Sequence, residues 1–309
     1  MWPTPPEVRD FEVFSRLPDR FRRRDTLTPW SAANRLGVPG DSFLEGPVFD
    51  AAGTLHVTDI EYGRIFGISP DGEWHLVAEF DGEPNGMKFL SPTELLVADY
   101  RNGLQVVDVT AGTVTAHLDR HNTERFKGIN DLVFDSAGRL YFTDQGQTGL
   151  HDPTGRVYRL HPDGRLDQLL STVPSPNGLV LTPDERVLFV AATRDNSVWR
   201  VPLMADGGVA KVGRFFAMNG PAGPDGLAID VEGRLVVANA GRGVVWVLDH
   251  TAEPVLVLRS PCGPLVTNIA YGGPDRTVLY CTESSTGTVL RAELDIPGCP
   301  LFVPRTGRT

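Results

Sequence analysis

One sequence pattern recurs six times along the chain, and this repeat constrains the fold more than any other feature. Two copies, Asn130–Asp144 and Asp225–Asn239, correspond position for position without a gap, and Glu45–Asp59 follows the same plan. Further units start at Asn85, Asn177 and Asn268. A period of about 40 to 50 residues is typical of propellers and other repeat arrays. The chain is therefore predicted to be built from six equivalent units.

Each unit contains the strands of one blade. An apolar strand is followed by an Asp-x-x-Gly turn, by a second alternating strand and by a third strand such as 157–160 or 244–247. The triplets 70–72 and 162–164, both Pro-Asp-Gly, lie where a hairpin to a fourth strand needs a residue that tolerates positive φ. No segment shows a sustained 3.6-residue apolar period, which excludes a helical bundle or a doubly wound sheet. The predicted fold is all-β, a six-bladed β-propeller with four-stranded blades.

The two ends of the chain are predicted to close the ring together. The last unit, 268–294, is one strand short, whereas the stretch 11–14 lies outside the repeat and has strand character. We expect this N-terminal strand to complete the last blade, with 17–40 as the connection to blade one. The prediction is a single domain over residues 1–309, with blades starting near residues 45, 85, 130, 177, 225 and 268.

Composition narrows the classes of partner. The net charge of -10 over 309 residues argues against nucleic-acid binding. The three cysteines lie far apart and form no CxxC pair, so neither a zinc knuckle nor a disulfide framework is indicated. The N-terminus lacks the regions of a signal peptide, and no stretch is long enough to span a bilayer. These features predict a cytoplasmic protein without a membrane partner, and they leave its oligomeric state open.

The first residues of the six units share an oxygen-bearing side chain. They are Glu45, Asn85, Asn130, Asn177, Asp225 and Asn268. Because the first strand of every blade lines the channel of a propeller, these side chains are expected to form a ring at one mouth. The alternative is that Asn-Gly and Asp-Gly pairs merely make turns between blades. Glu45 and the sequences Asn130-Asp131 and Asn268-Ile269 do not fit that alternative, so we favour a site.

A ring of carboxylate and carboxamide oxygens without Cys or His suits a hard cation. Ca²⁺ is favoured, Mg²⁺ and Mn²⁺ are alternatives, and Zn²⁺ is less natural. Two carboxylates leave such an ion with residual positive charge, and its open coordination positions allow it to polarise a substrate oxygen. The pattern therefore predicts one divalent cation in the central channel.

At these positions the chain resembles the senescence marker protein, gluconolactonase and luciferin-regenerating enzyme family, whose members are six-bladed propellers with one catalytic divalent cation. The resemblance runs from about residue 42 to 294. The motifs that show it are Leu44–Phe49, Gly128–Phe134, Ser175–Leu181 and Gly223–Asp230. It implies that Glu45, Asn177 and Asp225 are metal ligands and that Asn130 binds the ion or the substrate beside it.

The resemblance also implies a reaction, metal-assisted hydrolysis of a lactone. Asp225 would take a proton from the attacking water and return it to the leaving alkoxide. Sugar-lactone members hold their substrate with an arginine two residues before the Asn130 position, but this chain has Gly128 there, with Lys127 beside it. That departure puts sugar-lactone specificity in question.

Substrate contacts are predicted from the ring and from the loop beside it. They are Asn85, Lys127, Asn130, His151 and Asn268. Segment 144–156 is the longest insertion between two blade strands, so it is either a lid over the mouth or a solvated hairpin excursion. His151 lies in this loop, and the alternative for it is simple surface exposure.

Two other classes of function remain open at this level. The same fold and ligand set serve phosphotriester hydrolysis in fluorophosphatase-like relatives, and a propeller with a saturated structural ion can be a non-enzymatic binding protein. A metal-free relative of strictosidine synthase has no need of Glu45, Asn177 and Asp225. No nucleophile elbow, zincin helix, Walker loop or dinucleotide fingerprint occurs, so the metal site is the chemical candidate.

Overall fold

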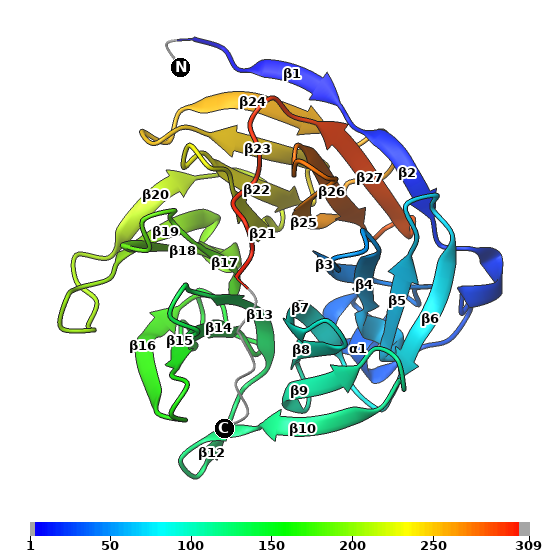
Figure 1. Cartoon of the computed structure of the whole chain (residues 1–309), viewed down its shortest axis with the longest axis horizontal. Coiled ribbons are helices and arrows are strands. Elements are labelled where there is room, and N and C mark those ends of the chain that lie inside the picture. The colour runs from blue at the N-terminus through cyan, green and yellow to red at the C-terminus, as the bar shows by residue number, and fades with distance from the viewer. Residues whose placement is uncertain (1–3, 303–309) are drawn as a thin grey trace.

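The computed structural model describes residues 4–302, so the ends of the predicted 1–309 domain lie outside it. Six main β-sheets stand around a common axis, as Figure 1 shows with the chain running from blue to red. Within each sheet, consecutive strands pair antiparallel and lie progressively further from the axis. The predicted all-β, six-bladed propeller is confirmed.

The strands fall into four concentric sets. The innermost strands are β3 (Leu44–Phe49), β7 (Pro84–Ser91), β13 (Ile129–Phe134), β17 (Pro176–Leu181), β21 (Gly223–Ile229) and β25 (Val266–Gly272). The second strands are β4 (Leu55–Asp59), β8 (Glu94–Asp99), β14 (Leu140–Asp144), β18 (Val187–Ala192), β22 (Leu235–Ala240) and β26 (Val278–Glu283). The third strands are β5 (Arg64–Ile68), β9 (Gly103–Asp108), β15 (Gly155–Leu160), β19 (Ser197–Pro202), β23 (Val244–Leu248) and β27 (Thr288–Glu293). The outer strands are β6 (Trp74–Glu79), β10 (Val114–Leu118), β16 (Leu166–Val173), β20 (Gly213–Ala217), β24 (Pro254–Arg259) and β2 (Glu12–Arg16). A small hairpin, β11 (Arg120–His121) with β12 (Glu124–Arg125), lies between blades two and three.

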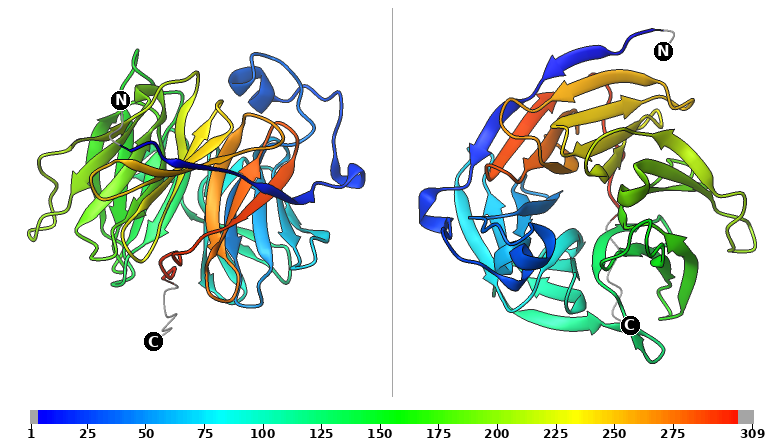
Figure 2. Two further views of the ribbon diagram at one scale, coloured as in Figure 1. Left: turned by 90° about the horizontal axis from the view of Figure 1, so that it is seen from above. Right: turned by 180° about the vertical axis from the view of Figure 1, so that it is seen from behind.

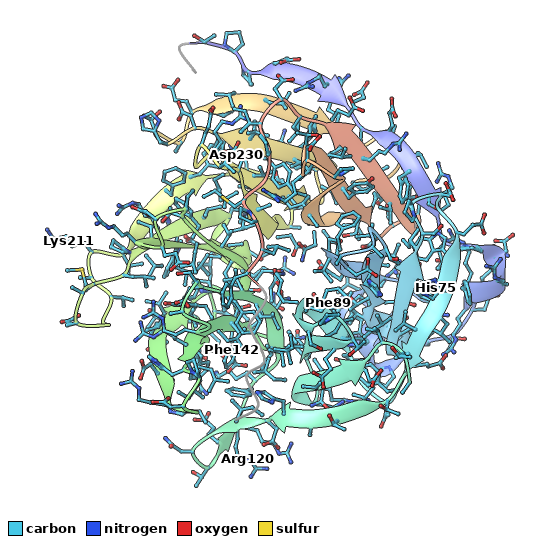
Figure 3. The ribbon with its side chains drawn as sticks, in the orientation of Figure 1. His75, Phe89, Arg120, Phe142, Lys211 and Asp230 are labelled. Carbon is cyan, nitrogen blue, oxygen red and sulfur yellow. The ribbon has the colours of Figure 1, made fainter. Side chains whose placement is uncertain are left out.

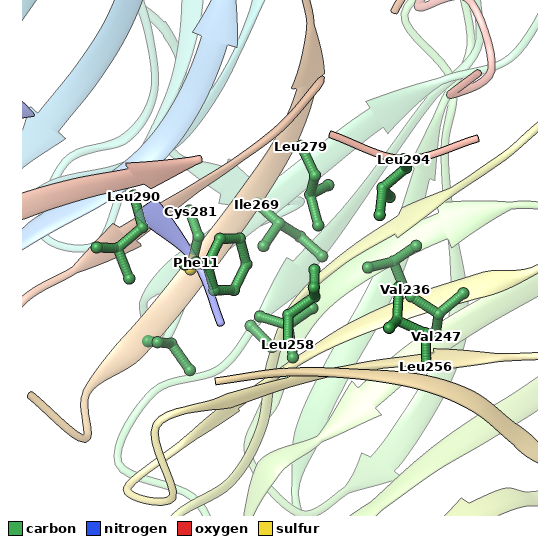
Figure 4. Packing of buried hydrophobic residues seen from close by; sticks show 13 residues of the cluster. Phe11, Val236, Val247, Leu256, Leu258, Ile269, Leu279, Cys281, Leu290 and Leu294 are labelled. Carbon is green, nitrogen blue, oxygen red and sulfur yellow. The ribbon is translucent and has the colours of Figure 1, made fainter. Parts of the chain in front are cut away.

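The N-terminal segment closes the ring, as predicted. β2 pairs antiparallel with β27 and becomes the outer strand of blade six. The segment also makes a pairing that the repeat did not predict. β1 (Glu7–Asp10) pairs parallel with β24 and adds a fifth strand to blade five. Figure 2 shows this ribbon running along the outside of the molecule. Phe11 stands between the two strands and packs against Leu258 and Cys281 in the core shared by these blades (Figure 4).

The connection from β2 to blade one contains two short helices, η1 (Asp19–Phe21) and α1 (Pro29–Asn34). α1 begins at a capping box, in which Thr28 accepts from the Ser31 backbone N–H, and Pro29 occupies its first turn. Trp30 is buried against Phe43, with ring centroids 4.7 Å apart. The helix is thereby fixed beside the start of β3.

The hydrophobic core lies between neighbouring blades. Between blades three and four, for example, Tyr141 and Val157 pack with Leu188 and Val190. Figure 3 shows the side chains filling these spaces, with Phe89 and Phe142 among them. The predicted outer hairpins also form, because Gly72 and Gly164 both have positive φ, 84° and 87°. No helix among residues 4–302 is both long and apolar enough to cross a membrane.

A cavity of about 1260 Å³ occupies the end of the channel where the innermost strands finish. Figure 1 shows the C-terminal segment crossing this face in red. The segment is attached to blades five and six, where Cys299 N–H donates to the Ile229 carbonyl at 3.0 Å and Gly298 N–H to Arg276 at 2.8 Å. The other end of the channel, where the innermost strands begin, carries the predicted site residues.

Candidate metal centre

Every innermost strand has a β-bulge near its start, and the bulge sets the direction of the predicted site residues. In blade three, for example, Ile129 pairs with Asp144 and Leu132 with Phe142, so Asn130 and Asp131 together face one residue of β14. An inserted residue re-aims the side chains around it. In five blades the residues that open the bulge are Asn85, Asn130, Asn177, Asp225 and Thr267, whereas in blade one Glu45 still pairs with Thr58 and directly precedes the bulge.

The ladder of blade six corrects one of the predicted strand starts. Val266 pairs with Glu283 and Ile269 with Cys281, so Thr267 opens the bulge and Asn268 is its second residue. The sequence match was one residue out of register because Asn268 is an asparagine like the strand-start residues Asn85, Asn130 and Asn177. Asn268 still lies in the ring, since its Nδ2 donates to Glu45 Oε2 at 2.8 Å.

Glycine is the common residue at the second position of the bulge, and the packing of the next blade explains why. In blades two to six this position is occupied by Gly86, Asp131, Gly178, Gly226 and Asn268, and in blade one Gly46 follows Glu45 in the same way. A Cβ on Gly178 would overlap the carbonyl oxygen of Asp225, and one on Gly86 would overlap the Asp131 carboxylate. Glycine is therefore required by the close approach of the next blade rather than by a turn between blades, which removes the alternative reading of the Asn-Gly pairs.

Hydroxyl groups clamp these strands to one another. Thr58 Oγ1 donates to the Asn85 carbonyl at 3.0 Å, and Thr143 Oγ1 donates to the Asn177 carbonyl at 2.8 Å. Thr267 donates in the same way to Leu44 at 2.9 Å and joins blade six to blade one. The backbone that carries the ring is fixed by hydrogen bonds from the preceding blade.

Four oxygens of the ring are buried without a hydrogen-bond partner among the described residues. They are the Oδ1 atoms of Asn85, Asn130, Asn177 and Asp225. A buried polar atom left unpaired costs about 1–3 kcal/mol, and native structures contain few of them. Four such acceptors at equivalent places in four successive innermost strands fit the ligand set of a hard cation.

The orientation of one ligand is fixed from outside the ring. Asn130 Nδ2 donates to Gln145 Oε1 at 3.1 Å, and Gln145 Nε2 donates in turn to Ser175 Oγ at 3.0 Å. The amide nitrogen is thereby held by Gln145, which leaves the Asn130 oxygen for another partner. Partners of this kind orient metal ligands in proteins.

Three carboxyl groups share this end of the channel. Burial raises the pKa of Glu45 to about 7, against hydrogen bonds from Gly46 and Asn268 that lower it. Burial and the neighbouring charges of Glu45 and Asp131 raise the pKa of Asp225 well above its usual range. Burial also raises the pKa of Asp131. The protein alone disfavours their ionised forms, and a cation at the ring would favour them.

Two charged residues of this region were missed in the sequence. Asp131 stands where four other blades have glycine, and that contrast was the available signal. Lys88 lies further along β7, where its charge lowers the pKa of both Glu45 and Asp131. Within residues 4–302 no three His, Cys, Asp or Glu side chains form a metal-binding group, so the candidate centre depends on its carboxamide oxygens.

The predicted loop contacts lie at the same end of the channel. Lys127 Nζ donates to Thr154 Oγ1 at 2.5 Å, so its ammonium is held by the 144–156 loop. Gln147, at the middle of that loop, donates to Asn34 of α1 at 3.2 Å and to Tyr100 at 3.0 Å. The loop is therefore tied to the N-terminal connection, and its action as a lid stays a prediction.

The structure explains why glycine occupies position 128 in this chain. A Cβ at this position would lie 2.6 Å from atoms of the Tyr100 ring. The arginine of sugar-lactone relatives does not fit here unless Tyr100 moves. The departure from the family pattern at Gly128 is thus accompanied by a tyrosine from the preceding blade.

Comparisons with known proteins place the chain in a family. The family model described as the SMP-30/Gluconolactonase/LRE-like region matches residues 43–285. The lactonase drp35 of Staphylococcus aureus is 30% identical over 252 residues, which cover 74% of this chain and 72% of the relative.

Solved structures share the fold. The calcium-binding protein regucalcin from Agrobacterium tumefaciens superimposes with a TM-score of 0.77 at 23% identity, covering 97% of this chain and 99% of that chain. A gluconolactonase from Xanthomonas campestris gives a TM-score of 0.71 at 21% identity, covering 96% and 98%. The two structures support the propeller architecture.

Proposed function

The chain belongs to the SMP-30/gluconolactonase/LRE-like family, and on this premise we propose that it is a divalent-metal-dependent lactone hydrolase. The observation that carries the proposal is the set of four buried, unpaired oxygens on Asn85, Asn130, Asn177 and Asp225. A small-molecule lactone is the substrate class that the drp35 relative suggests.

The residues that would hold the cation are Glu45, Asn130, Asn177 and Asp225, and the unpaired oxygen of Asn85 qualifies it as a further ligand or as a substrate contact. Ca²⁺ matches this all-oxygen set best, and Mg²⁺, Mn²⁺ or Zn²⁺ are the alternatives for the assay. When bound, such an ion supplies Lewis acidity toward a carbonyl oxygen and lowers the pKa of nearby water.

Asp225 is proposed to move the proton. Asp225 is the residue of the ring that keeps partial solvent exposure, and its Oδ1 is buried without a hydrogen-bond partner among the described residues. A carboxylate that accepts a proton from water and returns it to an alkoxide needs a pKa closer to neutrality than that of a free aspartate. Burial and the charges of Glu45 and Asp131 raise the pKa of Asp225, and a bound cation would act against this shift.

The remaining residues position these groups. Asn130 is oriented by Gln145, and the clamp from Thr193 Oγ1 to the Pro224 carbonyl, at 2.8 Å, fixes the backbone immediately before Asp225. The 144–156 loop, with His151, would cover the substrate from the same side. Each of these roles follows from a contact that holds a side chain or strand in one geometry.

The test is a panel of lactones and phosphotriesters assayed by pH-stat with EDTA-treated protein, to which each of the four metals is added back. Asp225→Asn should abolish turnover and leave the thermal unfolding transition cooperative. Asp230→Asn, at a buried aspartate that caps the far hairpin of the same blade, is the matched control and should keep its activity per folded molecule. Full activity of Asp225→Asn would refute the mechanism, and hydrolysis of phosphotriesters alone would replace lactones as the substrate class.

A further inference from the structure

The short helix η3 (Thr193–Asp195) connects β18 to β19 beside the candidate metal centre. Its first residue is buried and donates from Oγ1 to the carbonyl of Pro224, which directly precedes Asp225. The Thr193 N–H donates to the Ser175 carbonyl at 3.0 Å, and Asp195 accepts from Trp199 Nε1 at 3.0 Å. Both sides of the helix are thus attached to the scaffold. The residue between these attachments is Arg194.

Arg194 lies next to the 144–156 loop. Its Cβ lies 3.7 Å from the place where a Cβ of Gly149 would stand, and that place is 3.2 Å from His151 Nδ1. The guanidinium also lies close enough to Asp225 to lower the pKa of that carboxyl, against the larger effect of burial. Arg194 therefore lies between the 144–156 loop and the ring.

Arg194 is exposed and has no side-chain hydrogen bond or ion pair to another described residue. Lys127, another cation at this end of the channel, already has a partner, because it donates to Thr154. Position 128, where sugar-lactone relatives carry an arginine, is closed to a side chain by Tyr100. An arginine without a side-chain partner, on a well-attached helix beside a predicted active site, is suited to bind an anion.

We propose that Arg194 binds a carboxylate of the substrate, so that the preferred substrates are lactones bearing a carboxylate substituent; this rests on the proposed function of the same site. The planar guanidinium can donate two parallel hydrogen bonds to a carboxylate and orient the ring of the lactone over Asp225. One guanidinium matches one carboxylate in charge. Arg194 thus supplies from blade four the recognition that position 128 cannot supply.

The experiment uses two γ-lactones of equal size, one with a carboxylate and one with a carboxamide at the same carbon. With the metal-loaded protein, Arg194→Met should raise KM for the carboxylate lactone about 10- to 100-fold, the range of a charge-assisted hydrogen-bond pair. The carboxamide lactone should change by less than about 3-fold. Arg194→Lys should give an intermediate loss, because an ammonium keeps the charge without the fork. Arg186→Met, at an exposed arginine of the same blade, is the control and should match the unaltered protein.

Calorimetric binding of tetrahydrofuran-2-carboxylate, which has no lactone to hydrolyse, separates this inference from the proposed function. The compound should bind the metal-loaded protein and lose about 10-fold or more in affinity in Arg194→Met. Equal binding by both proteins would overturn the role of Arg194 while leaving lactone hydrolysis intact. An equal loss of kcat for both lactones would also overturn it, since that result would place Arg194 in the chemical step rather than in recognition.

Discussion

The sharpest quantitative prediction concerns Glu45 in the metal-free protein. This carboxyl is only 3% exposed, and burial raises its pKa from the ordinary 4.5 to about 7. The folded state therefore holds a proton on Glu45 in a pH range where the unfolded chain has released it. Stability falls with rising pH wherever the folded state binds more protons than the unfolded state.

The size of this loss of stability follows from the pKa values of Glu45 in the unfolded and folded states. A difference between 4.5 and about 7 corresponds to about 3 kcal/mol, fully present below pH 4.5 and lost as the pH rises through 7. For a chain of this size, about 3 kcal/mol is a change of roughly 6 °C in Tm. Asp131 and Asp225, whose pKa values are also raised by burial, add to the loss.

Glu45→Gln isolates the effect. The amide oxygen can still accept the hydrogen bonds from Gly46 and Asn268, which now reach Glu45 Oε2 at 2.7 and 2.8 Å. At pH 8, in EDTA, we expect the variant to be more stable than the unaltered protein by up to about 3 kcal/mol. At pH 4 the two should be alike, because Glu45 is protonated in both states.

Thermal unfolding with and without CaCl₂ is the assay. Calcium should stabilise the unaltered protein more at pH 8 than at pH 5, since the ion replaces a proton at low pH, and Glu45→Gln should lose most of this response. The reasoning would be refuted by a Glu45→Gln protein that is less stable than the unaltered protein at pH 8 in EDTA and still responds fully to calcium.

Three further predictions test the scaffold of the site. Gly178→Ala should destabilise the fold by about 1–3 kcal/mol in urea titrations, because its Cβ would overlap the Asp225 carbonyl; a neutral result would contradict the close approach of these blades. Gln145→Ala should weaken calcium binding about 10- to 100-fold by calorimetry, since it frees the Asn130 carboxamide to rotate, and unchanged affinity would remove Gln145 from that role. Phe11→Ala should lower the free energy of unfolding by about 3–5 kcal/mol, and a small effect would show that the N-terminal strands do not hold blades five and six together.

The blades could be predicted from the sequence because their signals are local. A strand, an Asp-x-x-Gly turn and an alternating strand recur within each unit, so six copies reinforce one another. The missing strand of the last blade pointed to the N-terminus, and β2 fills it. The parallel pairing of β1 with β24 had no such signal, because a short polar edge strand carries no periodicity of its own.

The residue types of the site could be predicted from the sequence, but the exact pairing of the strands that carry them could not. Oxygen-bearing residues at strand starts indicated a ring, but whether Thr267 or Asn268 opens the last bulge depends on which residues pair across β25 and β26. A one-residue shift in a strand is invisible in a pattern match and changes the direction of each side chain. Asp131 was overlooked for a related reason, since its importance depends on a neighbour in space, Gly86, that leaves room for its carboxylate.

The charges of the channel argue for a single divalent ion rather than none or two. Three carboxyl groups, on Glu45, Asp131 and Asp225, gather at the ring, and the pKa of each is raised by burial. Lys88 supplies one positive charge from within the channel and acts on Glu45 and Asp131. When all three carboxyl groups are ionised, one divalent cation brings the total charge of these groups, Lys88 and the ion to zero. A second divalent cation would leave an excess of positive charge in a low-dielectric site. A protein that lacks the ion must instead keep protons on these carboxyl groups, which is why the pH dependence of calcium stabilisation tests the site independently of any substrate.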